Sequence, residues 1–371
     1  MTRWIGAPLL AAMLAGCQPA PPEEAPLAQW LGADGSAFPA LDPGYVPQFP
    51  RDFGAHPEQR VEWWYATFNL QDGAGHRWGA QLALFRLALQ PGEMDMQGWE
   101  SRQLFMAHVA ISDLHGQRFA YRERLARPVL GLAGVQDDPL AVWIEQCRLQ
   151  ATQAEPPMRR RIECSIDGIS LELDVQSDGP PVLHGVNGYS EKSGAGNASF
   201  YYSQPWLSAQ GTLRLPGSAA VEVTGRGWFD HEWSPGLLKA GQRGWDWLSL
   251  QLDDGRALML FRLHDGQGGD AGVRGSLIAA DGTVSTLDDD DALMQPQRWW
   301  TSPHSGARYP LDWRVSLADH EIELTIRARM DDQELNTQVR YWEGSVEATG
   351  QARGAPLSGE GYLELTGYAA R

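Results

Sequence analysis

Hydrophobic and polar residues alternate with a period of two through most of the chain, as in residues 61–68 (VEWWYATF). Successive side chains of a strand point to opposite faces, so this pattern predicts strands with one buried face. Glycine, proline and Asp-Gly pairs separate the alternating stretches and predict tight turns. Long amphipathic helices are not indicated. The pattern predicts an all-β protein of the sandwich or barrel class.

The chain length and an internal sequence repeat predict two domains. A chain of 371 residues is longer than most single cores support. Aligning the Asp-Gly turn at 72–73 with the one at 254–255 places Trp63-Trp64-Tyr65 over Trp245-Asp246-Trp247. We therefore expect a duplicated unit. Two domains would result, one at 44–235 and the other at 236–371.

The first residues indicate export. Residues 1–17 hold an apolar run that closes with Leu14-Ala15-Gly16-Cys17, a secretory signal too short to span a bilayer as a mature helix. This ending resembles the bacterial lipobox, in which the cysteine is acylated; the alternative is a plain signal peptide that ends in cysteine. We expect lipidation at Cys17 and a flexible tether at 18–43. The protein would then lie on the periplasmic side of the cell envelope, held by lipid to the outer membrane.

The two remaining cysteines, Cys147 and Cys164, lie symmetrically about a turn at 154–157 (AEPP). An antiparallel hairpin centred there would place them opposite each other, and an oxidising periplasm would let them pair. The spacing therefore predicts a cross-strand disulfide.

Composition limits the partners. The formal charge is −17 and basic residues do not cluster, so nucleic acid is excluded as a partner. The 16 tryptophans favour an aromatic pocket for an apolar small molecule.

Two segments place polar residues in aromatic strands: Glu62-Trp63-Trp64-Tyr65 and Trp228-Phe229-Asp230-His231-Glu232-Trp233. A buried carboxylate is costly unless it is hydrogen-bonded, so such acids serve either structure or function. The structural alternative is pairing with Arg86 or Arg262.

Strand geometry assigns the second segment to two faces. Asp230 and Glu232 share one face with Trp228, whereas His231 shares the other with Phe229 and Trp233. Adjacent strand residues cannot converge on one ion without a bulge. We therefore expect no metal site here, and we expect no cofactor.

Two further segments are candidates for binding. His108 lies in the strand Phe105-Met106-Ala107-His108, either as a core residue or facing the pocket. The loop Gly188-Tyr189-Ser190-Glu191-Lys192-Ser193 is of a kind that often carries binding groups. It lacks a Gly-x-Ser-x-Gly elbow, which disfavours a serine hydrolase.

These segments, together with Phe200-Tyr201-Tyr202-Ser203, Gly244-Trp245-Asp246-Trp247 and Tyr341-Trp342-Glu343-Gly344, resemble the AttH-like family of predicted secreted hydrolases. That family is related to bacterial carotenoid 1,2-hydratases (hydroxyneurosporene synthases). The resemblance implies two packed lipocalin-like (calycin-type) antiparallel barrels and an isoprenoid- or lipid-like ligand. It also implies an association with ABC exporter components.

A hydratase must protonate an alkene and add water to the resulting cation. Asp230 or Glu232 is the candidate acid, and His231 is the candidate base that positions the water. The strand at 258–262 carries no second acid, and Asp246 is the substitute. The remaining expected ligand-binding residues are Glu62, Trp64, Tyr65, His108, Tyr189, Lys192, Trp228, Trp233, Trp245 and Trp247. The competing hypotheses are a cyclase, a non-catalytic lipid carrier that serves an ABC exporter, and a purely structural lipoprotein.

Overall fold

The computed structural model describes residues 37–91, 99–153, 158–177, 179–193, 196–236, 238–239, 241–264 and 272–368. The signal segment with Cys17, most of the tether and the turn at 154–157 lie outside these residues. Within the described part, no helix is both long enough and apolar enough to cross a bilayer.

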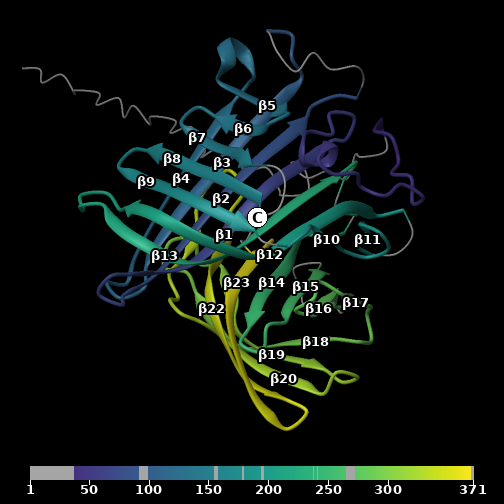
Figure 1. Cartoon of the computed structure of the whole chain (residues 1–371), viewed down its shortest axis with the longest axis vertical. Coiled ribbons are helices and arrows are strands. Elements are labelled where there is room, and N and C mark those ends of the chain that lie inside the picture. Colours follow the sequence, from purple (N-terminus) through teal and green to yellow (C-terminus); the bar gives the residue numbers. More distant parts are fainter. Residues whose placement is uncertain are drawn as a thin grey trace, which may run out of the picture.

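The chain forms two antiparallel sheets, which Figure 1 shows stacked along the long axis of the molecule. The first contains β1 (Val61–Asp72), β2 (Arg77–Ala88), β3 (Gln103–Asp113), β4 (Arg118–Ala126), β5 (Ala133–Asp137), β6 (Leu140–Ile144), β7 (Cys147–Gln153), β8 (Met158–Ile166), β9 (Ile169–Ser177), β10 (Val182–Leu183), β11 (Tyr189–Glu191), β12 (Ala198–Arg214) and β13 (Val221–Ser234). Two short 3-10 helices, η2 (Arg51–Phe53) and η3 (Val129–Gly131), flank its strands.

The second sheet contains β14 (Gly244–Leu252), β15 (Ala257–His264), β16 (Arg274–Ile278), β17 (Val284–Leu287), β18 (Leu293–Thr301), β19 (Arg308–Leu317), β20 (Ile322–Ala328), β21 (Glu334–Leu335), β22 (Tyr341–Ala352) and β23 (Ala355–Thr366). The first sheet curves into a nearly closed barrel and the second into a half-barrel, which confirms the predicted fold class. The chain passes from one sheet to the other between Ser234 and Gly244.

The two sheets share one topology. In each, the opening strand pairs with the closing strand: β1 with β13 and β14 with β23. In each, the opening strand also forms a hairpin with the next strand, β2 or β15. This common order is what a duplicated unit would produce.

Both barrel interiors are filled by the protein's own side chains. Trp64, Phe229 and Trp233 belong to the apolar core of the first sheet, and Trp313 and Trp342 to that of the second. Close-packed side chains occupy both interiors, so neither interior offers the aromatic pocket that the composition predicts. A third apolar cluster lies between the sheets, and it is there that the candidate site is found.

The hairpin of β7 and β8 has the register expected from the cysteine spacing. Cys147 lies directly opposite Cys164, and a disulfide joins them. Both are buried in the core of the first sheet, and Figure 1 shows their strands β7 and β8 in the part of that sheet away from the second sheet.

Candidate functional site

A cavity of about 70 Å³ lies between the two sheets. Tyr65, Tyr201 and Trp247 line its buried part, while Trp63 and Trp245, which are partly exposed, form its mouth. The walls come from β1, β12 and β13 on one side and from β14 and neighbouring strands on the other. The cavity is thus an aromatic slot between two filled barrels.

Alternation along β13 brings carboxyl groups to this slot. Asp230 and Glu232 line the cavity, whereas Phe229 and Trp233 pack in the core of the first sheet. Trp228 lies in the cluster between the sheets. The predicted division of this segment into two faces is confirmed.

Asp230 is buried without a cationic partner among the described residues. The Tyr201 hydroxyl donates to Oδ2 at 2.8 Å and Trp228 Nε1 donates to Oδ1 at 2.6 Å, while the Ser203 hydroxyl also donates to Oδ1. Burial raises the pKa of Asp230 to about 7, and these three donors lower it only in part. Near neutral pH the side chain therefore exists in both protonation states.

Glu232 has a cationic partner. Lys192 Nζ lies 2.9 Å from its carboxylate and sits over the rings of Tyr201 and Phe261, 4.8 and 4.5 Å from their centroids. Lys192 follows β11, which begins after Gly188 at φ +93°, a conformation that favours glycine. The loop therefore delivers the one lysine that lines the cavity in the described chain.

Two acids from the second sheet complete the site, and neither was predicted as a site residue. Glu343 on β22 pairs in register with Glu364 on β23, and both line the cavity. The Tyr65 hydroxyl and Gln81 Nε2, the latter at 2.6 Å, donate to Glu343, and Trp245 Nε1 donates to Glu364 at 3.1 Å. In the sequence, each of these two acids occupies an inward-facing position of an otherwise apolar strand.

Both of these carboxyl groups resist ionisation. Burial, followed by the neighbouring Glu364, raises the pKa of Glu343 well above its usual range. Loss of water contact raises the pKa of Glu364 to about 7. Two adjacent carboxylates repel each other, so this pair retains a proton at neutral pH. The cavity therefore holds carboxylic acids, with their protons, against aromatic faces.

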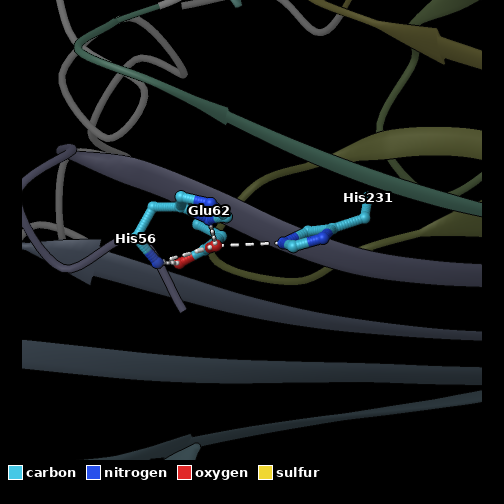
Figure 2. A group of neighbouring side chains, drawn as sticks. All are labelled: His56, Glu62 and His231. Atoms are coloured by element: carbon cyan, nitrogen blue, oxygen red, sulfur yellow. Dashed lines mark hydrogen bonds and ion pairs between the residues drawn. The ribbon is translucent and has the colours of Figure 1, made fainter. Parts of the chain in front are cut away.

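A second buried cluster of charged and polar side chains, centred on Glu62, lies on the opposite face of β13. Figure 2 shows Glu62 between the imidazoles of His56 and His231. Glu62 Oε1 is 2.8 Å from His56 Nδ1 and 2.9 Å from His231 Nε2, and Arg86 Nε donates to Oε2 at 2.8 Å. All four side chains are buried.

Hydrogen bonding accounts for this cluster without an ion. Burial opposes its charge, but Arg86, His231 and His56 hold the pKa of Glu62 well below its usual range. Burial also opposes the charge on His56, yet hydrogen bonds to Asp52 and Glu62 raise its pKa to about 9. The three atoms that could hold a metal lie within 4.8 Å of one another. Arg86 and protonated His56 already supply the positive charge that a metal ion would bring.

Comparisons with known proteins give the family. The AttH-like family model matches residues 40–368. This chain belongs to the AttH-like family. A crystal structure of an AttH from Nitrosomonas europaea is 34% identical, covers 90% of this chain and 100% of that one, and superposes with a TM-score of 0.79.

More distant structures share the fold of this AttH-like protein. Kievitone hydratase from Nectria haematococca is 13% identical, covering 90% of this chain and 96% of that one with a TM-score of 0.67. CghA is 14% identical, covering 92% and 97% with a TM-score of 0.51. No curated protein matches the sequence.

The structure brings some of the expected site residues of the AttH-like chain together. Six of them line the cavity: Tyr65, Lys192, Asp230, Glu232, Trp245 and Trp247. Trp228 lies directly behind, bonded to Asp230.

Other expected residues lie elsewhere. Glu62, Trp64 and Trp233 face the interior of the first sheet, because alternate residues of a strand face opposite sides. Tyr189 packs against the edge of that core. Asp246 faces the second barrel, where Arg262 Nε donates to it at 2.6 Å. The structural alternative, pairing with Arg86 or Arg262, is therefore correct for Glu62 and Asp246.

His231 cannot serve the cavity as a base from this position. Its Nε2 contacts Glu62 and its Nδ1 lies 3.1 Å from the Tyr202 hydroxyl, both on the far side of β13. Burial lowers its pKa to about 4, so the ring is neutral. The expectation that His231 positions the water is wrong.

A serine nucleophile is also disfavoured by position. Ser203 Oγ lies 2.6 Å from His184 Nε2, a distance that a Ser-His pair requires. Ser203 is fully buried, however, and its hydroxyl donates to Asp230. This pair supports Asp230 rather than meeting a ligand.

Proposed function

We propose that this AttH-like protein binds the end of an apolar, isoprenoid- or lipid-like alkene between its two sheets and adds water to it without a cofactor. One observation carries the proposal: carboxyl groups with raised pKa values, contributed by both sheets, face a single aromatic cavity. An ordinary surface acid is ionised at neutral pH and cannot protonate a carbon-carbon double bond.

The first chemical step is protonation. Asp230 in its neutral form transfers a proton to one alkene carbon and leaves a cation on the other. The faces of Trp247 and Tyr65 stabilise that cation, and the negative charge left on Asp230 lies beside it. Water then adds to the cation. Glu343 and Glu364 provide a second store of protons at the same cavity.

The size of the cavity limits what can enter. About 70 Å³ corresponds to roughly five water positions, which is comparable to a small branched end group and far below a whole polyene. We infer that the reacting end enters the slot. The rest of the molecule would leave through the partly exposed mouth at Trp63, Phe85 and Trp245.

Kievitone hydratase, whose name describes addition of water, shares the fold over nearly all of its length. This likeness supports a hydratase on the same scaffold. The acids supply the chemical argument that the fold alone does not.

The alternative function is a non-catalytic carrier of an apolar molecule. The ion pair between Glu232 and Lys192 favours a carrier, because a carrier does not need an acid without a cationic partner. Asp230, Glu343 and Glu364 have no such cation in the described chain, and they favour the enzyme.

We also propose that Cys17 carries lipid and that the protein works on the periplasmic side of the cell envelope. An ABC exporter is then the proposed partner, and an anchored protein would meet apolar molecules as they leave the membrane.

The test uses squalene, a long alkene with branched ends, incubated with the protein in ¹⁸O-labelled water. We expect ¹⁸O-labelled alcohol from the wild type and a loss of about 100-fold or more in Asp230→Asn. Quenching of tryptophan fluorescence by squalene should persist in that variant. Asp281→Asn, in an exposed hairpin turn, is the matched control. Binding without any labelled alcohol would establish the carrier instead.

A further inference from the structure

A line of three side chains leads from the cavity to the surface. Tyr341 lines the cavity, and its hydroxyl lies 2.8 Å from His108 Nδ1. The other ring nitrogen, Nε2, lies 2.9 Å from Glu123 Oε2. Tyr341 and His108 are buried, whereas the Glu123 side chain is 15% exposed. The line therefore connects the cavity with solvent.

The hydrogen bonds have one consistent direction. Glu123 Oε2 also accepts from the backbone N–H of Gln338 at 3.1 Å, so this oxygen acts as an acceptor. His108 Nε2 then carries the ring proton and donates to Glu123. His108 Nδ1 is left to accept the Tyr341 O–H. A hydroxyl, an imidazole that can take its proton and a carboxylate that orients the imidazole are the parts of an activated acid–base unit.

We propose that Tyr341 and His108 are the base that activates water at this cavity, with Glu123 as the positioning residue. The proposal rests on the hydratase function proposed above and supplies the base that His231 cannot provide. Tyr341 would touch the water, so it is the catalytic residue, whereas His108 takes the proton through it.

The proton balance closes. The alkene takes a proton from Asp230, and water bonds to the cation through a lone pair. The resulting oxonium passes a proton to the Tyr341 oxygen while the Tyr341 proton moves to His108 Nδ1. His108, now an imidazolium beside Glu123, returns its Nδ1 proton through the Tyr341 hydroxyl and a water in the emptied cavity to the carboxylate of Asp230, which restores the Nε2–H tautomer. Alkene and water have become an alcohol, and no group has changed.

The surroundings of Tyr341 favour a neutral hydroxyl that passes a proton on, and they disfavour an ionised phenolate. Burial, and then Glu343 and Glu364, raise its pKa well above the usual value. Its hydroxyl therefore stays protonated and can only pass a proton on. The other buried histidines near the cavity are committed elsewhere: His184 contacts Ser203 and Ser276, and His231 contacts Glu62 and Tyr202.

The experiment measures kcat and KM for hydration of squalene in ¹⁸O-labelled water. Tyr341→Phe and His108→Gln should each lower kcat about 100-fold or more, with KM changed less than about threefold. Glu123→Gln should lower kcat about 10-fold. Because the two groups act as one unit, the double variant Tyr341→Phe/His108→Gln should be no slower than either single variant. Tyr309→Phe, which removes a buried hydroxyl bonded to Glu334 in the second barrel, is the control.

A second measurement does not depend on turnover. In ¹⁵N-histidine-labelled protein, His108 should be the Nε2–H tautomer, and Tyr341→Phe should shift its Nδ1 resonance. Wild-type kcat in Tyr341→Phe, multiplying losses in the double variant, or the Nδ1–H tautomer would each overturn the inference. If Asp230→Asn is inactive while Tyr341→Phe is not, only this inference falls. If the wild type forms no labelled alcohol, the proposed function and the base fall together.

Discussion

Glu62 and Asp230 are both buried acids of the first sheet. Glu62 faces the interior of that sheet and Asp230 faces the cavity, and their surroundings differ. Glu62 meets Arg86, two histidines and the backbone N–H of His56, and its pKa is held low. Asp230 meets three neutral donors, and its pKa rises to about 7. Burial is common to both, so burial alone does not mark a functional acid. The charge of the partners and the direction of the pKa shift distinguish a structural acid from a candidate catalytic one.

The largest expected effect is on the Glu62 side. Glu62→Gln leaves the guanidinium of Arg86 buried without its carboxylate and should lower the free energy of unfolding by about 3–5 kcal/mol. Denaturant unfolding measures this, with Glu222→Gln, an exposed acid on β13, as a control expected within about 0.5 kcal/mol. Equal stability of the two variants would remove the contrast.

The opposite sign is expected on the cavity side. The folded state holds a proton on Glu343 that the unfolded chain gives up above about pH 4, so this residue makes the protein less stable as pH rises from there. Glu343→Gln should therefore raise the free energy of unfolding at pH 8 by about 1 kcal/mol or more, and by less at pH 5. A loss of stability at pH 8 would place Glu343 with Glu62 as a structural acid.

The smallest effect concerns binding. Asp230 and Glu364 both titrate near pH 7, and an apolar ligand meets more charge once they ionise. The affinity for squalene, measured by tryptophan fluorescence, should fall about threefold between pH 6 and pH 8. The double variant Asp230→Asn/Glu364→Gln should bind equally at both values; a residual pH dependence would point to other groups.

Much of the fold follows from local pattern. The period-two alternation identifies strands, and the symmetry of Cys147 and Cys164 about a turn gives their register. The same alternation divides residues 228–233 into two faces correctly. The expected ligand-binding residues Glu62, Trp64 and Tyr65, by contrast, do not share one face. Trp63 and Tyr65 face the cavity, whereas Glu62 and Trp64 face the core.

The local pattern does not predict which strand lies across the cavity. Glu343 and Glu364 meet Asp230 only because β22 and β23 of the second sheet pack against the first. Alternation marks the inward residues of a strand, but it does not say which distant strand they face. Residues 258–262 carry no acid, and the further acids of the cavity, Glu343 and Glu364, lie about 80 and 100 residues beyond them in the chain.

The position of the slot between two independently packed barrels has an evolutionary consequence. Substitutions in its walls leave both apolar cores intact, so ligand preference can drift without loss of folding. The two halves depend on each other for a different reason. A gene split between Ser234 and Gly244 would leave Tyr65, Asp230 and Glu232 on an open surface, and neither product would enclose the cavity.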